Sequence, residues 1–525
     1  MTLPHKTILD PHDVEQIVAD PNVLSIMTRQ QAEDFGICVF SRDGRKLYAI
    51  TTNEFPIKVA SFTATQSASG YTVQYFYTSQ EGFVLCLRRY DILQQQQQAK
   101  LRERQAQLNA QGQTAIATIK ELYEKREEWN TNDWIMEIVR LGYQAGASDI
   151  HFQSHDDGIL LRLRIDGVLH SILHIPHDVY FPYGKKLKFI AGTKMNIDHL
   201  PQDGRFTIQA KNKNGILTGI DVRANFMPGI KSDNTVLRFL DSSQGIMTLD
   251  QLGMWSDAMT VFRNNIARTN GLILITGPTG SGKTTTLYSI LSHKNTGQSK
   301  IITLEDPIEY QIPGIQQSQI NYAKGYDYET GLKACMRQDP DVILLGETRT
   351  PETAQTVVTA ALTGHLCFTT LHTNSALDAI ARMLSLDVKP YLLAPALTMI
   401  VAQRLVRRLC IHCQTRRPPN DSEQGILRQR EEILGGSWTY PASCTVPTAG
   451  GCPHCQGLGF KGRIAIHEVL HIGQDIKNAL VTGSTDETIH HLAKKTPGYR
   501  PMLHDGLEKM LQGLTSLDEI QRVLI

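Results

Sequence analysis

A glycine-rich segment between an apolar run and a helical pattern carries the clearest chemical signal in this 525-residue sequence. The apolar run Leu272–Ile275 predicts a buried strand, and apolar residues at helical spacing begin at Leu287. Between them, "GPTGSGKT" has the spacing of a P-loop, whose glycines let backbone N–H groups turn toward phosphates. An ordinary glycine-rich turn with a surface lysine is the alternative, and the complete spacing disfavours it. We therefore predict that ATP binds at Gly277, Pro278, Thr279, Gly280, Ser281, Gly282, Lys283, Thr284 and Thr285.

Two of these residues have side chains with predicted roles of their own. Lys283 is expected to reach the β- and γ-phosphates, and the Thr284 hydroxyl is expected to ligate Mg²⁺. A P-loop also needs an acidic partner, and the apolar run "DVILLGET" ends in Gly346 and Glu347 where an aspartate is usual. Glu347 is therefore the predicted catalytic residue, which polarises water or holds Mg²⁺ through water. Capping of the next helix is its structural alternative.

A second apolar run, "IITLEDPIEY", also ends in acids, namely Glu305, Asp306 and Glu309. Alone they would suit a solvated loop, but beside a P-loop we predict a role near the metal, with Glu305 catalytic. Two histidines, His365 and His372, flank the apolar run "LCFTTL". Each is predicted to contact the γ-phosphate or to relay across a subunit interface, while a purely structural role stays open for both.

Five of the nine cysteines cluster between Cys410 and Cys455, which in a reducing compartment suggests metal binding before disulfides. The two Cys-x-x-Cys pairs predict a closed structural Zn²⁺ site with four thiolate ligands, Cys410, Cys413, Cys452 and Cys455. The 38 intervening residues exceed the usual spacing, so such a site would close a long loop. His412, His454 and Cys444 are competing ligands.

The composition is that of a soluble globular protein of several domains, with 41% hydrophobic and 20% charged residues. A net charge of +1 argues against a global field for nucleic acid or membranes. We expect no transmembrane segment, because no apolar stretch reaches about 18 residues, and no secretory leader at "MTLPHKTILDPHDVEQ". The protein is expected to be cytoplasmic and to reach a membrane only through a partner.

Composition and patterning predict four regions. Residues 1–92 form a small α+β module for docking or regulation, with strands at "FGICVF", "KLYAITT", "YTVQYFYT" and "FVLCLRRY". Residues 93–130 form a glutamine-rich helical linker, and 131–243 a strand-rich α+β domain. Residues 248–525 form an α/β ATPase domain with a mostly parallel sheet and a metal-binding insertion at about 408–460.

These motifs together resemble the secretion ATPases that drive type IV pilus assembly and type II secretion, over about residues 130–525. "GPTGSGKTTTLY" is similar to the Walker A motif of that family, "ITLEDPIEY" to its Asp box, "MRQDPDVILLGETR" to its Walker B motif and "TGHLCFTTLHTN" to its His box. "VAQRLVRRLC" and "GCPHCQGLGFKGRIAIHEVL" resemble its tetracysteine region, and "ASDIHF", "RLRIDGVL" and "PQDGRFTI" its preceding domain. The sequence departs at "GETRT", where "GEIRD" is usual, and residues 1–92 match no pattern of the family.

The resemblance implies a RecA-like P-loop core, a PAS-like α+β domain before it and a ring-shaped homohexamer. It also implies arginines donated to the nucleotide, which by motif match are the catalytic Arg205 and Arg223, with Arg238 a weaker candidate. An inner-membrane platform protein would be the partner. Retraction motors of this superfamily typically lack both a long N-terminal module and the tetracysteine insertion, so we predict an assembly motor.

Three other functions remain alternatives. A type II secretion motor has the same chemistry and a different cargo. A nucleic-acid-binding ATPase of conjugation or DNA uptake would use a basic patch near the cysteines, Arg404, Arg407, Arg408, Arg416 and Arg417, although no aromatic residues are interleaved and we do not expect nucleic acid. A scaffold that does not hydrolyse nucleotide is the last alternative.

Overall fold

The computed structural model describes residues 8–17, 29–52, 56–68, 70–90, 114–129, 131–211, 216–240, 245–435, 438–441 and 443–524. The chain divides into two compact units, Met1–Leu141 with Pro176–Phe189, and Gly142–Ile175 with Ile190–Ile525. Of the predicted glutamine-rich helical linker 93–130, residues 93–113 and 130 lie outside the described residues, and residues 115–124 are helical.

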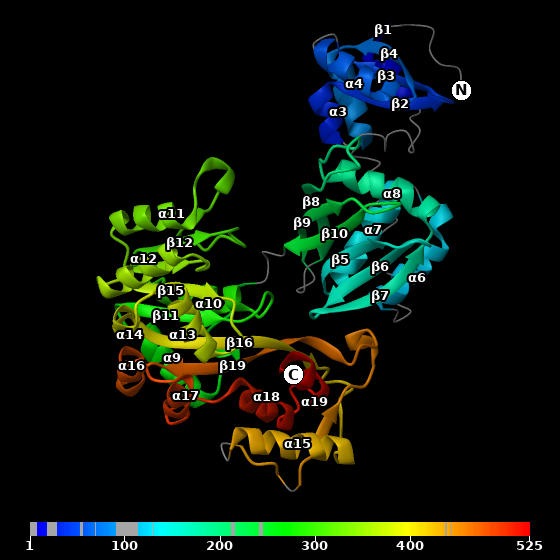
Figure 1. The fold of residues 1–525 in the computed structure, drawn as a ribbon. Helices are drawn as coiled ribbons and strands as arrows, with labels where there is room; N and C mark the ends of the chain where they lie inside the picture. Colours follow the sequence, from blue (N-terminus) through cyan, green and yellow to red (C-terminus); the bar gives the residue numbers. More distant parts are fainter. Residues whose placement is uncertain are drawn as a thin grey trace. The chain divides into compact units, whose positions relative to one another are not determined.

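The N-terminal part of the first unit is a four-stranded sheet with helices. The sheet order is β1-β4-β3-β2, with β1 (Ile8–Leu9), β2 (Ile37–Asp43), β3 (Lys46–Thr51) and β4 (Thr72–Thr78). The helices are α1 (Pro11–Gln16), α3 (Arg29–Phe35), α4 (Pro56–Ala68) and a helix at residues 80–90. Figure 1 shows these helices beside the sheet, as the α+β prediction required. One apolar core, which includes Phe40, Phe62 and Phe76, joins them.

The predicted strand "FVLCLRRY" is wrong, because residues 80–90 are helical. Its buried hydrophobic residues are Phe83, Cys86, Leu87 and Tyr90, which recur at the three- and four-residue spacing of a helix. Ser79 also starts the helix, since its hydroxyl accepts a hydrogen bond from the N–H of Gly82 at 3.2 Å. The periodicity therefore favours a helix over the short apolar strand that composition suggested.

The remaining helices of the first unit are α6 (Ala115–Glu124), α7 (Thr131–Gln144) and α8 (His177–Ile190), with a 3₁₀ turn η1 (Arg126–Glu128). Trp134 is fully buried and packs on Tyr183, with ring centroids 4.2 Å apart. Its indole N–H donates to the Leu122 carbonyl at 3.1 Å, so the large apolar side chain leaves no polar atom unpaired.

The second unit contains a six-stranded antiparallel sheet of order β7-β6-β5-β10-β9-β8. Its strands are β5 (Ala147–Ser154), β6 (Ile159–Ile165), β7 (Val168–Ile175), β8 (Gln202–Lys211), β9 (Leu217–Met227) and β10 (Asn234–Leu240). Burial alternates along β9, where Ile220, Val222, Ala224 and Phe226 are buried and the residues between them are exposed. One face of this sheet is thus apolar and the other carries polar side chains.

The same unit contains a seven-stranded sheet of order β13-β12-β14-β15-β11-β16-β19, parallel except for the last pair. Its strands are β11 (Gly271–Thr276), β12 (Ile301–Glu305), β13 (Gln316–Gln319), β14 (Val342–Leu345), β15 (Leu366–Leu371), β16 (Leu397–Leu409) and β19 (Phe460–His471). Strand β11 is buried throughout, and its residues alternate between two apolar cores, with Leu272 and Leu274 in one and Ile273 and Ile275 in the other. Burial on both faces explains the continuous apolar runs.

Helices cover both faces of this sheet (Figure 1). One core includes residues of α9 (Ser256–Ile266) and α10 (Lys283–Lys294). The other includes residues of α11 (Tyr328–Cys335), α12 (Pro351–Leu362), α13 (Ala376–Ser385), α14 (Pro390–Ala396), α16 (Gln474–Val481) and α17 (Asp486–Lys494). Short 3₁₀ turns are η2 (Asp250–Leu252), η3 (Tyr322–Lys324) and η4 (Met336–Gln338). The layers confirm the predicted α/β fold class with a mostly parallel sheet.

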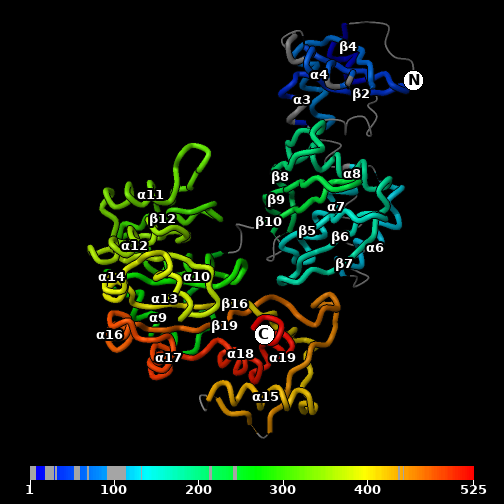
Figure 2. The backbone as a smooth tube through the Cα atoms, viewed as in Figure 1, coloured from blue at the N-terminus to red at the C-terminus, as the bar shows by residue number. Residues whose placement is uncertain are grey.

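Strands β16 and β19 pair along their length and run to a small additional module (Figure 2). This module holds β17 (Thr415–Arg417), α15 (Asp421–Leu434), β18 (Val446–Thr448) and η5 (Pro453–Cys455). A third core joins it to the C-terminal helices α18 (Met502–Leu511) and α19 (Leu517–Leu524). Among the described residues, no helix is long and apolar enough to cross a membrane.

Candidate active site and metal centre

The P-loop connects β11 to α10, as the sequence predicts, and its backbone requires glycine. Gly280 and Gly282 have φ values of 78° and 89°, which side-chain-bearing residues rarely adopt. A Cβ at Gly277 would lie 2.4 Å from the Gln403 carbonyl oxygen. The buried Ser281 hydroxyl has no partner among the described residues. A glycine-built cradle with a spare polar group at a helix N-terminus fits a bound triphosphate.

Lys283 points back into this loop, where its ammonium donates to the carbonyls of Gly277 at 2.6 Å and Pro278 at 3.1 Å. Burial lowers the pKa of Lys283, and the Glu347 carboxylate opposes that shift. Thr284 and Thr285 are both exposed in the first turn of α10. Hydrogen-bonding groups for phosphates and a hydroxyl for Mg²⁺ therefore lie in one short segment.

The carboxyl ends of the parallel strands bring Glu347 and His372 to the same edge of the sheet as the P-loop, since β11, β14 and β15 are neighbours. The Glu347 carboxylate lies 2.7 Å from Arg349 Nε and 3.7 Å from His372 Nε2. Burial is the largest cause that lowers the pKa of His372, and the Lys283 charge is the second. The lowered pKa favours a neutral imidazole. Arg349 was not singled out from the sequence, although it lies two residues beyond Glu347.

Glycine at position 346 has a steric reason. A Cβ there would approach the Tyr328 hydroxyl to 2.8 Å and the Leu304 carbonyl oxygen to 3.1 Å. The usual aspartate would therefore clash with neighbouring residues at this position, whereas glycine fits.

Glu305 ends β12 and is buried. Its carboxylate accepts hydrogen bonds from the hydroxyls of Tyr288 and Thr303 and from the Gln317 amide. Asp306, the next residue, is exposed. The side chain predicted to be catalytic at position 305 thus has three protein donors already, and Asp306 is the solvent-facing acid of the pair.

His365 lies at the opposite end of β15 from His372. Its carbonyl accepts from the N–H of Gly271, at the start of β11, and its ring contacts the Ala360 carbonyl at 3.0 Å. Six strand residues separate the two histidines, which corresponds to about 20 Å. The P-loop and His372 are brought together within the chain, and His365 is not.

Strand register aligns the three arginines that the resemblance selected. Arg205 on β8 is directly opposite Arg223 on β9, and Arg223 is directly opposite Arg238 on β10. All three are exposed. Directly opposite residues share a face of an antiparallel sheet, so the three guanidinium groups form one row.

Gln403 on β16 is a residue of this region that sequence reasoning missed. Its amide donates to the Ser281 carbonyl at 2.8 Å and accepts from the Thr286 hydroxyl at 2.9 Å. It is buried, and it connects the P-loop and α10 to the neighbouring strand. A polar residue within the apolar run 397–406 was the available signal.

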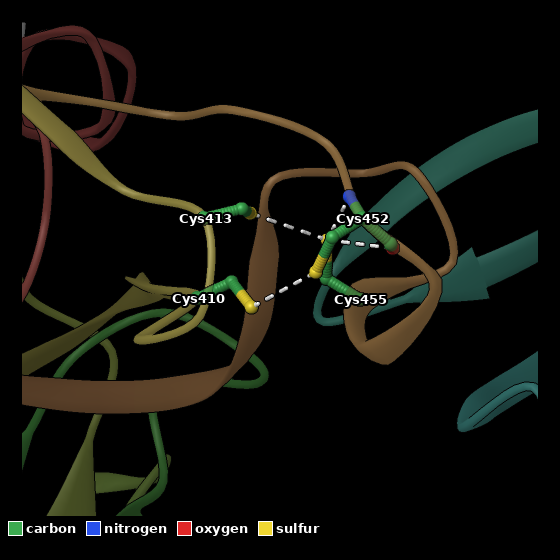
Figure 3. A group of neighbouring side chains, drawn as sticks. All are labelled: Cys410, Cys413, Cys452 and Cys455. Carbon is green, nitrogen blue, oxygen red and sulfur yellow. Dashed lines mark hydrogen bonds between the residues drawn. The ribbon is translucent and has the colours of Figure 1, made fainter.

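Figure 3 shows the four cysteines of the two Cys-x-x-Cys pairs with their sulfurs turned toward one another. All four Sγ atoms of Cys410, Cys413, Cys452 and Cys455 lie within 4.8 Å of one another. Three of the pairs are separated by 3.7 to 3.8 Å. A tetrahedral Zn²⁺ with Zn–S bonds of about 2.3 Å would place its sulfurs about 3.8 Å apart, so the donor set fits zinc.

The competing ligands lie outside this cluster. The rings of His412 and His454 stack on each other, with centroids 4.1 Å apart. Cys444 is buried in the third apolar core.

Several arginines of the basic patch are engaged in structural contacts. Arg407 pairs with the buried Glu519 and lies over the Phe460 ring. Arg417 makes two hydrogen bonds to Glu423, at 2.7 and 2.8 Å. Arg416 donates to the Leu511 carbonyl at 3.0 Å. These contacts favour the structural interpretation of the patch over nucleic-acid binding.

Comparison with known proteins shows which family this chain resembles. Residues 124–522 match the family model "Type II/IV secretion system protein". The type II secretion system protein E of Aeromonas hydrophila is 39% identical over 378 residues, 72% of this chain and 72% of that protein. The type IV pilus assembly ATPase PilB of Thermus thermophilus is 36% identical over 394 residues, 75% of this chain and 43% of that protein.

A similar fold occurs in a solved structure. The ATPase DotB of Legionella pneumophila is 20% identical, with a TM-score of 0.55, over 75% of this chain and 95% of that one.

The chain belongs to the type II/IV secretion system protein family, which confirms the resemblance drawn from its motifs. It is an ATPase of that family.

Proposed function

We propose that this chain is a cytoplasmic motor, assembled as a ring-shaped hexamer, that powers extension of a type IV pilus through an inner-membrane platform protein. The observation that supports motor chemistry best is the shared sheet edge at which the P-loop, Glu347 and His372 meet. The PilB relative, which matches 75% of this chain, supports the pilus assignment.

Each residue of the site has a proposed task. ATP bound with Mg²⁺ supplies the phosphoanhydride bond whose hydrolysis releases the energy. Lys283 and the loop N–H groups hold the phosphates, and Thr284 ligates the metal ion. Glu347 orients the attacking water and His372 lies beside it as a neutral hydrogen-bonding group. Arg205 and Arg223 neutralise charge that develops on the γ-phosphate, and Arg238, whose motif match is weaker, is the third candidate for this role.

The four cysteines hold Zn²⁺ in a closed structural site in this proposal. No water or substrate position is needed there, because four thiolates complete a tetrahedral shell. The ion stabilises the small module that leaves the sheet after β16.

A type II secretion motor is the second candidate, and the 39% identity to type II secretion system protein E favours it. The two functions share their chemistry and differ in cargo. A chromosomal Lys283→Ala replacement in the native host separates them. Loss of surface fibres with normal protein secretion supports the pilus motor, and the reverse phenotype supports the secretion motor.

Hydrolysis itself is tested with purified protein. Replacing Glu347 by Gln keeps the side-chain shape and removes the base, so kcat for ATP should fall by about 10²–10⁴-fold while nucleotide still binds. Glu352→Gln is the matched control, because this exposed glutamate lies in the first turn of α12, outside the proposed site. Full activity in the Glu347 variant would refute the catalytic assignment.

A further inference from the structure

The arginine row extends over two further strands. Arg238 on β10 is directly opposite Asp149 on β5, and Asp149 is directly opposite Arg164 on β6. One register line across five strands therefore reads Arg205, Arg223, Arg238, Asp149 and Arg164. Four cations and one anion share one line of one sheet face.

The charges in this row are unevenly compensated. Asp149 Oδ1 lies 2.7 Å from Arg238 Nε, and Asp149 Oδ2 lies 3.5 Å from Arg164 Nε. Within the described ranges, Arg205 and Arg223 have no carboxylate partner. Like charges directly opposite each other on a sheet are unfavourable, so an anion at or beside a row of three arginines stabilises it.

Asp149 differs from the arginines in burial. Its side chain is 5% exposed, whereas that of Arg238 is 63% exposed. The Ser148 hydroxyl also donates to Asp149 at 2.8 Å. The buried carboxylate thus accepts a hydrogen bond from Nε of Arg238. The two terminal NH₂ groups of that guanidinium make no hydrogen bond to Asp149.

We propose that Asp149 is a positioning residue, which holds the Arg238 guanidinium in line with Arg223 and Arg205 so that the three arginines act together on the phosphates of ATP. This inference rests on the proposed motor function and adds to it the residue that organises the arginines. Arg205 and Arg223 supply the uncompensated charge, and Arg238 supplies a charge-balanced anchor whose outer nitrogens remain available.

The test is a double-mutant cycle on the full chain, measured as kcat and KM for ATP with Mg²⁺. Asp149→Asn should lower kcat by about tenfold to a hundredfold, because a misplaced group costs rate even when it is still present. Arg238→Gln should lower kcat similarly, and the double variant should match Arg238→Gln within about twofold. Additive losses in the double variant would overturn the inference, because Asp149 would then not act through Arg238.

Two further variants separate positioning from folding and from charge. Arg238→Lys keeps the charge of an exposed side chain but lacks the guanidinium fork, so its kcat should fall with an unchanged melting temperature. Asp221→Asn removes a carboxylate from the same sheet face, where it bonds the Thr207 hydroxyl at 2.7 Å, and should leave kcat unchanged. Full activity of Arg238→Lys, or an equal loss in Asp221→Asn, would contradict the inference.

Other results would count against the proposed function itself and not against the role of Asp149. If Arg223→Gln keeps full kcat, the arginines do not serve hydrolysis, and the proposed function loses that part. If Arg223→Gln lowers kcat while Asp149→Asn and Arg238→Lys do not, the arginine role stands and only the positioning role of Asp149 is wrong.

Discussion

Gln403 shows what a single buried amide contributes to the nucleotide site. Both of its functional groups are used, one by the P-loop carbonyl of Ser281 and one by the Thr286 hydroxyl of α10. A Cβ at Gly282 would come within 3.2 Å of the same amide nitrogen. The conformation of the loop is therefore set from β16 as well as from its own glycines.

Replacement of Gln403 by Leu should weaken nucleotide binding. The change leaves a buried hydroxyl and a buried carbonyl unpaired, at about 1–3 kcal/mol each, and part of that energy distorts the loop. We expect an affinity loss of about tenfold or more, measured by titration with a fluorescent ATP analogue.

The matched control for this change is Gln355→Leu, at an exposed position of α12. If the Gln403 variant binds nucleotide as tightly as the parent does, Gln403 has no part in shaping the loop.

The sequence predicted the site residues that belong to short motifs. It did not predict the residues whose role depends on contacts between distant segments of the chain. Gly277–Thr284 and the four cysteines are local patterns, and the structure brings each set together. The partners of Glu305 and the amide of Gln403 depend on strands that meet only in the folded sheet. Register, which no single segment encodes, aligned the arginines.

At the scale of elements, the N-terminus of α13 meets a buried carboxylate from another strand. Glu468 on β19 accepts hydrogen bonds from the Ala376 N–H and from the Tyr499 hydroxyl, the latter at 3.1 Å. Burial raises the pKa of Glu468 to about 7, Asp378 adds to that shift, and the two hydrogen bonds oppose it. The first residue of α13, the helix after His372, therefore contacts a carboxyl group that can titrate.

This contact predicts a pH dependence of stability. A carboxyl whose folded pKa of about 7 exceeds its unfolded value stabilises the fold fully below the unfolded pKa and loses that contribution as pH rises through 7. Between pH 5 and 8 the parent should lose about 2–3 kcal/mol relative to Glu468→Gln, in which position 468 cannot ionise. Thermal unfolding midpoints of both proteins, compared at each pH, check this, and parallel curves would contradict it.

The cysteine module allows a metal-removal experiment. Four thiolates within 4.8 Å repel one another without a cation between them. A strong chelator should therefore release one zinc ion per chain, lower the unfolding midpoint and expose residues 414–451 to protease. Metal analysis and limited proteolysis measure the outcome.

Cys444→Ser and His412→Asn are the controls for that experiment, because both residues were competing ligands and lie outside the thiol cluster. Each should retain one zinc ion per chain, whereas Cys413→Ser should not. Zinc content that falls in either control and not in the Cys413 variant would reassign the ligands.

The helix at residues 80–90 marks the limit of prediction for elements. Short apolar runs fit strands and helices equally well by composition, and the burial of every third or fourth residue decided for a helix. The strand at Leu272–Ile275 was predicted correctly because its continuous apolar run ends at a glycine and a proline, whereas β13, β16 and β19 were not predicted.

At the scale of the whole molecule, the position of His365 bears on assembly. It lies about 20 Å along β15 from the edge that holds the P-loop, so it does not reach the nucleotide of its own chain. Contact with a phosphate would require a second copy of the chain, as in the proposed hexamer.

Activity should therefore depend on protein concentration. Specific ATPase activity should rise on concentration and level off when the particle mass reaches six chains, measured by light scattering and phosphate release on the same samples. Lys283→Ala should give the same particle without activity. Constant specific activity in a monomeric dilution series would exclude this dependence on assembly.

Strand β16 has one more consequence. It pairs with the P-loop strand at Leu397–Ala402, contacts the P-loop through Gln403, and ends at Leu409, directly before the first thiol ligand. The cysteine module is thus attached to the same strand that contacts the P-loop, about 20 Å away along an extended chain. A displacement of β16 at the P-loop would therefore move Cys410 as well, because one continuous strand leads from one to the other.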